Sequence, residues 1–141
     1  MTYSSLKSKL QTAATAGSIT TLVFGYLDEV NILRTDTRWP VVCIIPPNKP
    51  LKVRSEPVEF ITVDVEMYII DEWSRDWDAT QREATWDAID GKAQLFFRSF
   101  DTQSGVVLMN PDNVQSQPII NGIINEEVIA VKYDFKVKLY C

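Results

Sequence analysis

The sequence predicts an α+β fold, in which a mainly antiparallel sheet carries one long amphipathic helix packed on it and a short N-terminal helix. Apolar side chains fall on every second residue in 58–70 and again in 128–140, which is the spacing of two long strands. Apolar residues at steps of three and four run through 78–100, the spacing of a helix that covers a sheet. A chain of 141 residues with these elements indicates a single domain, 1–141.

The two strand-like segments also predict each other as neighbours. The polar positions of 58–70 are mainly acidic and those of 128–140 mainly basic, so pairing would set unlike charges opposite each other. Such pairs typically contribute ~0.2–1 kcal/mol each. The apolar face should form the core. It should bury Val63, Val65 and Met67 beneath a helical stripe that consists of Trp86, Ile89, Ala93, Phe96 and Phe100.

The first half of the chain supplies shorter elements. Residues 2–16 have helical spacing and end before Gly17, a plausible helix stop. Residues 19–33 are rich in β-formers, and Gly25 indicates a bulge or a close backbone approach there. Residues 41–45 form an apolar run bracketed by prolines, which predicts a strand.

The stretch 46–57 should be the exposed tip of a long hairpin between 41–45 and 58–70. It holds four of the seven prolines. Its basic residues Lys49, Lys52 and Arg54 would bind phosphates only weakly, and a solvated tip explains them equally well.

Carboxylates and tryptophans gather just before the long helix. The acidic residues could hold Mg²⁺ or Ca²⁺ through oxygen ligands, but their spacing fits no EF-hand, and a solvated, helix-capping turn is the better interpretation; these residues are Asp71, Glu72, Asp76 and Asp78. Thr80 and Glu83 have the spacing of a capping box. Trp73 and Trp77 either join the core at the helix entrance or serve as exposed interface anchors, and the sequence favours neither.

Two further signals concern backbone geometry. Gly91 interrupts the helical segment and suggests close approach to the sheet. After a short predicted strand at 106–109, Asn121-Gly122 between two Ile-Ile pairs indicates a hairpin.

Composition and motifs argue against an enzyme. The chain has no histidine, which removes the commonest general base and most catalytic zinc sites. It contains no P-loop, dinucleotide fingerprint or CxxC motif, so we expect no catalytic site, no metal and no cofactor. The net charge of −5 argues against a dedicated nucleic-acid binder, although it allows a protein that lets DNA pass.

The two cysteines suit a reducing compartment. Cys43 lies in an apolar run and should be buried, and Cys141 should be exposed; a disulfide between them is not needed for folding. No segment has the length of a membrane span or the pattern of a signal peptide, so we expect a soluble protein made in the cytoplasm.

Several features follow one another in a characteristic order along the chain. They are a short opening helix, Phe24-Gly25-Tyr26, the strand entry Trp39-Pro40-Val41-Val42, a long hairpin into 58–70, the amphipathic helix and the closing strand 130–140. This order resembles that of the tail-terminator proteins of tailed bacteriophages, the tail-completion family of the head–tail neck. The resemblance spans most of the chain but has no counterpart for residues 103–125.

The resemblance implies a structural virion protein that forms a homo-oligomeric ring, usually a hexamer, at the head–tail junction. Such a ring caps the tail tube, contacts the tail tube protein and the neck or stopper protein, and leaves a lumen through which DNA passes without specific binding. An acidic lumen suits that role because it repels DNA. The main alternative is a soluble ligand-binding or regulatory α+β domain with no virion role.

A ring of identical subunits requires two different patches that fit each other. The best complementary pair in the sequence is the basic tip (Lys49, Lys52 and Arg54) and the acidic turn (Asp71, Glu72, Trp73, Asp76 and Trp77). We therefore expect the tip of one subunit to dock on the turn of the next, with Trp73 or Trp77 as the anchor.

Overall fold

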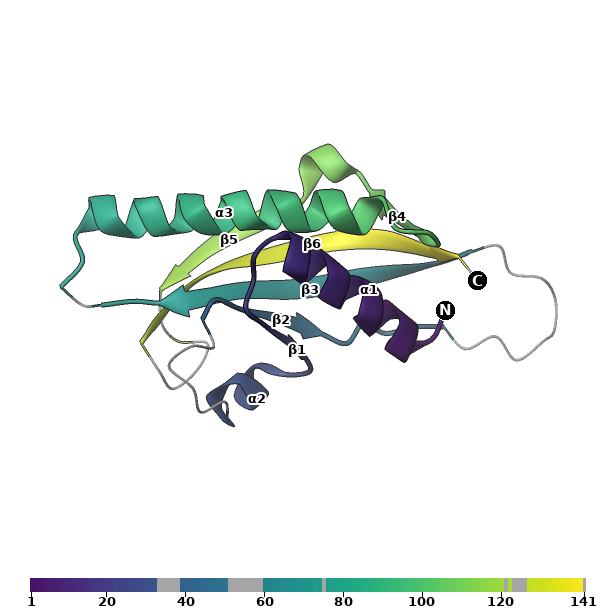
Figure 1. The fold of residues 1–141 in the computed structure, drawn as a ribbon, viewed down its shortest axis with the longest axis horizontal. Helices are drawn as coiled ribbons and strands as arrows, with labels where there is room; N and C mark the ends of the chain where they lie inside the picture. Colours follow the sequence, from purple (N-terminus) through teal and green to yellow (C-terminus); the bar gives the residue numbers. More distant parts are fainter. Residues whose placement is uncertain (33–38, 51–59, 75, 121, 123–126, 141) are drawn as a thin grey trace.

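Two long central strands form the axis of the fold (Figure 1). The structure, a computed structural model, describes residues 1–32, 39–50, 60–74, 76–120, 122 and 127–140. Strands β3 (Phe60–Glu72) and β6 (Val128–Tyr140) pair antiparallel over all 13 residues of each. Both strand predictions are confirmed: β6 has the predicted bounds, and β3 lies two residues further along the chain than predicted.

The sheet has six strands, in the order β1-β2-β3-β6-β4, with β5 also paired to β6. Strand β2 (Val41–Ile45) pairs antiparallel with β3, which confirms the predicted hairpin. Strand β1 (Thr21–Phe24) pairs parallel with β2, so the sheet is mixed rather than purely antiparallel. On the other side of β6 lie β4 (Val106–Met109) and β5 (Gln115–Ile120), one after the other along the same edge.

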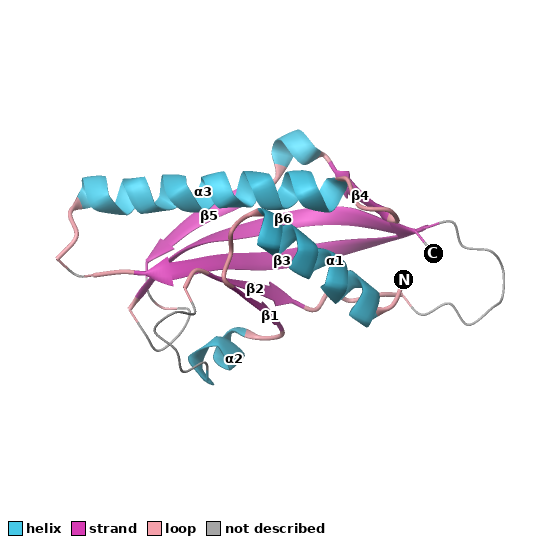
Figure 2. Ribbon diagram, viewed as in Figure 1, coloured by secondary structure: helices cyan, strands magenta, loops and turns pink. Residues whose placement is uncertain are grey.

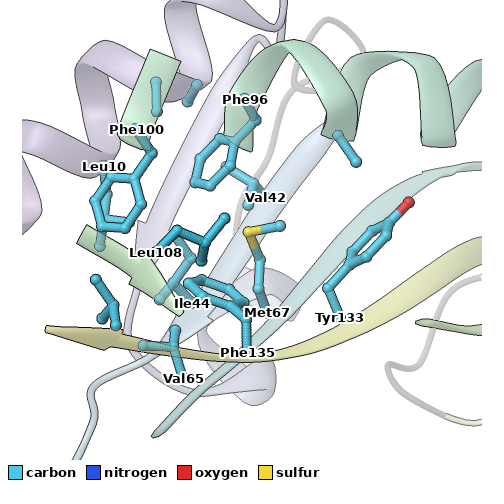
Figure 3. Packing of buried hydrophobic residues seen from close by; sticks show 14 of the residues in the cluster. Leu10, Val42, Ile44, Val65, Met67, Phe96, Phe100, Leu108, Tyr133 and Phe135 are labelled. Carbon is cyan, nitrogen blue, oxygen red and sulfur yellow. The ribbon is translucent and has the colours of Figure 1, made fainter. Parts of the chain in front are cut away.

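Two helices cover one face of this sheet, which establishes the α+β class (Figure 2). They are α1 (Tyr3–Ala16) and α3 (Ala79–Asp101), and both pack into one large apolar cluster. Figure 3 shows Phe96 and Phe100 of α3 pointing down toward Met67 and Phe135 of the central strands. The predicted stripe is confirmed, except that Trp86 is only partly buried; its indole Nε1 donates to the Ala130 carbonyl oxygen at 3.1 Å.

The start of α3 differs from the prediction. The helix is capped by Asp78, whose carboxylate accepts the Gln81 N–H at 2.9 Å while the Gln81 side chain accepts the Asp78 N–H. Thr80 and Glu83 therefore do not form the capping box, because the chain enters the helix two residues earlier than that pair requires.

The prediction that Gly17 ends the first helix is confirmed, whereas the prediction for Gly91 is wrong. Gly91 is exposed, and a Cβ placed there would meet nothing within 4 Å, so it does not permit a close approach. Gly17 ends α1 with an ordinary negative φ of −83°. A Cβ at Gly17 would lie 2.8 Å from the Lys92 carbonyl oxygen, so this glycine lets the end of α1 pass against α3.

The opposite face of the sheet is covered only in part. Helix α2 (Leu27–Ile32) packs there over a second apolar cluster that includes Val30, Cys43 and Tyr68. The expectation of a β-rich segment over 19–33 is wrong beyond Phe24, because the chain turns at the buried Gly25, where a Cβ would overlap the Glu29 carboxylate. Burial raises the pKa of the Cys43 thiol to about 12, and Cys141 lies outside the described residues.

The uncovered part of that face carries the charges of β3 and β6. Asp64 lies opposite Lys136, and their charged atoms are 3.4 Å apart, as predicted for unlike pairs. Glu66 instead lies opposite Asp134, which contradicts that prediction. Lys132 compensates by pairing with both carboxylates, at 3.1 Å and 3.7 Å.

The sheet edge beside β6 is interrupted. Met109 pairs with Lys136 and Gln115 pairs with Asp134, so residues 110–114 lie opposite the single residue Phe135. This excursion contains the 3₁₀ turn η1 (Pro111–Asn113) and begins at Asn110 with φ of +50°. The hairpin predicted around Asn121-Gly122 is confirmed, since β5 and β6 are antiparallel neighbours and Ile120 pairs with Ile129.

Candidate functional site

The predicted basic tip is only partly described, since Lys52 and Arg54 lie outside the described residues. Lys49 is half-buried rather than free at a tip. Its Nζ donates to the Met1 carbonyl oxygen at 3.0 Å and lies 5.1 Å from the centre of the Tyr3 ring. Lys49 thus fastens the chain after β2 to the start of α1.

The predicted acidic turn lies at the other end of β3. Asp71 is partly buried, and burial raises the pKa of its carboxyl group. Glu72, Asp76 and Asp78 are exposed, and Asp78 is committed to the α3 cap. In the described part of the chain, no three carboxylate or thiol side chains lie close enough together to hold a metal ion.

Both tryptophans of this turn are half-buried. The Trp77 carbonyl oxygen accepts a hydrogen bond from the Arg82 guanidinium at 3.3 Å, which ties the turn to α3. The indole Nε1 of Trp73 is buried, and no acceptor for it exists among the described residues. A buried donor in that state costs about 1–3 kcal/mol, and among the described residues of the turn Trp73 carries such a donor.

Lys49, the described member of the basic tip, and the acidic turn lie toward opposite ends of the long axis. Lys49 bonds to Met1, beside the N-terminus marked in Figure 1, and the acidic turn follows the end of β3 that leads into α3. At ~3.3 Å per residue, a strand of 13 residues separates its ends by about 40 Å. One subunit therefore cannot pair Lys49 with its own acidic turn.

A groove that the sequence did not predict lies between α3 and the interrupted sheet edge. Its volume is about 460 Å³. The 3₁₀ turn η1 stands beside the C-terminal half of α3 and forms one wall (Figure 1). The groove is lined from α3 by Asp90, Ala93, Gln94, Phe97, Arg98 and Asp101, and from the sheet side by Leu108, Pro111, Asp112, Val114, Ser116 and Tyr133.

The floor of this groove is aromatic. Tyr133 is 4% exposed, and its hydroxyl, which Figure 3 shows raised from the sheet toward α3, donates to the Asp90 carboxylate. Burial and this hydrogen bond raise the pKa of Tyr133. The Phe97 ring meets Tyr133 and Phe135 edge to face, with centroids 5.8 Å and 4.9 Å apart.

The walls of the groove are acidic. The Asp101 carboxylate accepts the Leu108 N–H at 2.8 Å and so fastens β4 to α3. Asp112 and Arg98 have no ion pair among the described residues. The polar run 110–114 is visible in the sequence, but only the pairing on either side of Phe135 shows that it forms a wall.

No protein-family profile matches the chain, and no curated protein has a significantly similar sequence. Among the described residues, no helix combines the length and the apolar character that crossing a bilayer requires.

Proposed function

We propose that this chain is a structural protein of a tailed bacteriophage, a tail terminator that assembles into a ring at the head–tail junction. The ring, most simply a hexamer, closes the tail tube and joins it to the neck of the virion. Its partners are further copies of itself, the tail tube protein and the neck or stopper protein. DNA passes through the lumen of the ring without specific binding. The resemblance in element order supports this, since the opening helix, the β2–β3 hairpin, α3 and β6 follow one another in that order.

The observation that carries the proposal is the state of Trp73 in the turn after β3. Its indole N–H is buried without an acceptor among the described residues, at one end of the molecule and beside exposed carboxylates. Aromatic side chains are enriched at the energetic centres of interfaces. A small rotation of Trp73 on docking would bring this N–H to an acceptor on a neighbouring subunit and remove the cost of leaving it unsatisfied.

The arrangement of the two patches fits a head-to-tail contact. The acidic turn (Asp71, Glu72, Trp73, Asp76 and Trp77) and Lys49 of the basic tip lie toward opposite ends of β3, whose 13 residues span about 40 Å at ~3.3 Å per residue. Opposite patches of unlike character are what a closed ring of identical subunits requires. In this arrangement the charges set register and association rate, and the tryptophan supplies the buried contact.

Native mass spectrometry and sedimentation test the proposal. Six copies of the 16.1 kDa chain give a particle of about 97 kDa. Reversing Lys52 and Arg54 to Glu, with Lys49 kept because its Nζ bonds to Met1 within the same subunit, should leave a folded monomer. Reversing Asp71, Glu72 and Asp76 to Lys in the same chain should partly restore the particle. Lys7→Glu, on the exposed side of α1, is the control and should change nothing. A monomeric wild-type protein would refute the ring.

The Trp73→Phe variant separates a role in assembly from a role in folding. It removes the unsatisfied N–H and keeps an aromatic ring, so the monomer should be no less stable while the oligomer dissociates more readily. If Trp73→Phe lowers the free energy of unfolding and leaves the oligomer intact, Trp73 belongs to the core and the contact lies elsewhere.

A ligand-binding or regulatory domain is the second candidate, and the groove beside α3 favours it. The same measurements distinguish the two, because such a domain would stay monomeric whichever patch is reversed.

A further inference from the structure

The groove between α3 and the excursion 110–114 is a separate binding surface at a different place from the two patches. We propose that it binds an extended segment of a partner protein that presents a lysine or arginine side chain. This binding does not depend on ring formation, because neither the basic tip nor the acidic turn contributes a lining residue.

The lining of the groove is negatively charged. Three carboxylates, those of Asp90, Asp101 and Asp112, face one guanidinium, that of Arg98, which leaves the groove with a net charge of −2. Two of the three carboxylates already accept one hydrogen bond each, from Tyr133 and from the Leu108 N–H. An ionised carboxylate can accept several more, so all three retain capacity for a cationic donor.

The aromatic floor of the groove suits the side chain of lysine or arginine. Phe97 is partly exposed and leans on Tyr133, so the base of the groove offers ring surface beneath the carboxylates. A lysine or arginine side chain has an apolar stem and a charged end, and aromatic faces attract the cation while the carboxylates accept its hydrogen bonds. A purely apolar ligand would leave the carboxylates without a partner.

The length of the groove along α3 fits a short extended peptide. The lining residues of α3 run from Asp90 to Asp101, eleven residues along the helix, or about 16 Å at ~1.5 Å per residue. That length matches about five residues of extended chain at ~3.3 Å each. Gln94 and Ser116 stand on the two walls and can hydrogen-bond the backbone of such a segment. A single small cation would fill only part of the groove.

The arrangement is built into the fold rather than into one loop. Asp101 holds the Leu108 N–H, which fixes the strand before the excursion, and residues 115–120 pair with β6 after it. Both walls are therefore anchored to paired strands and to a long helix, and the surface exists before any partner arrives.

The test uses the full chain and a capped pentapeptide, Ala-Val-Arg-Val-Ala, with binding followed by line broadening of the peptide's proton NMR signals. The comparison peptide carries citrulline, a neutral analogue, in place of arginine. The arginine peptide should bind at least about fivefold more tightly, and Asp112→Asn should weaken it about two- to fivefold, as expected for a partly exposed ion pair. Asp112 is exposed and has no ion pair among the described residues, so the variant should fold normally.

Two further variants make the result specific. Asp87→Asn removes an exposed carboxylate from α3 outside the groove and should leave the affinity unchanged. Asp112→Lys changes the net charge of the lining from −2 to 0 and should weaken binding of the arginine peptide more than Asp112→Asn does. Four results would overturn the proposal: no binding of the arginine peptide at millimolar concentration, equal binding of the citrulline peptide, an equal loss with Asp87→Asn, or ethylguanidinium binding as tightly as the peptide.

Discussion

Replacing Gly91 by alanine should stabilise the protein. Gly91 lies in the middle of α3, it is exposed, and an added Cβ would meet nothing within 4 Å. The substitution therefore reduces the entropy of the unfolded chain and improves helix propensity without a steric cost. Together these effects amount to about 1 kcal/mol. For a domain of this size that corresponds to a rise in Tm of roughly 3–5 °C.

The matched control is Gly17→Ala, the same chemical change in a different environment. Here the added Cβ would lie 2.8 Å from the Lys92 carbonyl oxygen, a backbone atom that cannot move alone. Forcing α1 and α3 apart should cost about 1–3 kcal/mol, the usual range for overpacking. The two variants should therefore shift stability in opposite directions.

Urea unfolding followed by circular dichroism measures both variants at one fixed protein concentration, because self-association would otherwise shift the midpoint. If Gly91→Ala is neutral or destabilising, the outer face of α3 is covered by another chain or strained, and the reasoning from its open environment is wrong. If Gly17→Ala is harmless, the helix crossing is looser than the structure indicates.

Three further changes have definite expected results. Trp86→Ala should lower the free energy of unfolding, measured with denaturant, by about 3 kcal/mol. This is the low end of the range for a large aromatic residue, because the ring is only partly buried. A loss below about 1 kcal/mol would show that the buried face of α3 is assigned wrongly. In a Cys141→Ser variant, which leaves Cys43 as the single thiol, Cys43 should react with a thiol reagent at pH 8 only after unfolding, because burial raises its pKa to about 12. Rapid reaction of this variant in the native state would contradict the burial of Cys43. Hydrogen bonds from Tyr68 and Lys132 lower the pKa of Glu66 in the folded protein. The ionised Glu66 therefore contributes to the free energy of unfolding above pH 4.5, its ordinary pKa, and this contribution is lost as the pH falls through the lowered pKa of the folded state. Glu66→Gln should remove that part of the acid dependence, at most about 1 kcal/mol because both side chains are partly exposed to solvent. An unchanged pH profile would count against the pairing of Glu66 with Lys132.

The elements with a long, regular pattern could be predicted from the sequence. Strands β3 and β6 and helix α3 each repeat one spacing over more than a dozen residues, so their burial follows from periodicity alone. Helix α2 could not be predicted, because six residues give less than two turns and its stability comes from packing on the second cluster.

The site was harder to predict than the fold. The carboxylates and tryptophans of the acidic turn could be recognised in the sequence. The unsatisfied indole N–H of Trp73 could not be predicted, because it depends on which atoms surround the ring in the folded protein. The groove was not visible at all. Its walls are Asp90 to Asp101 and the excursion 110–114, which come together only because β4 and β5 pair with the same strand on either side of Phe135. No local sequence pattern specifies the register between strands that are far apart in the chain.

The interruption of the sheet edge has a consequence for the behaviour of the protein in solution. Without it, β4 and β5 would form one continuous outer strand, and a long free edge is a template on which other chains can add and aggregate. Instead the edge is divided into runs of four and six residues, and the longer run contains Pro118, which has no N–H to offer. The excursion 110–114, which supplies Pro111, Asp112 and Val114 to the groove, thus also limits unwanted edge-to-edge pairing at high local concentration.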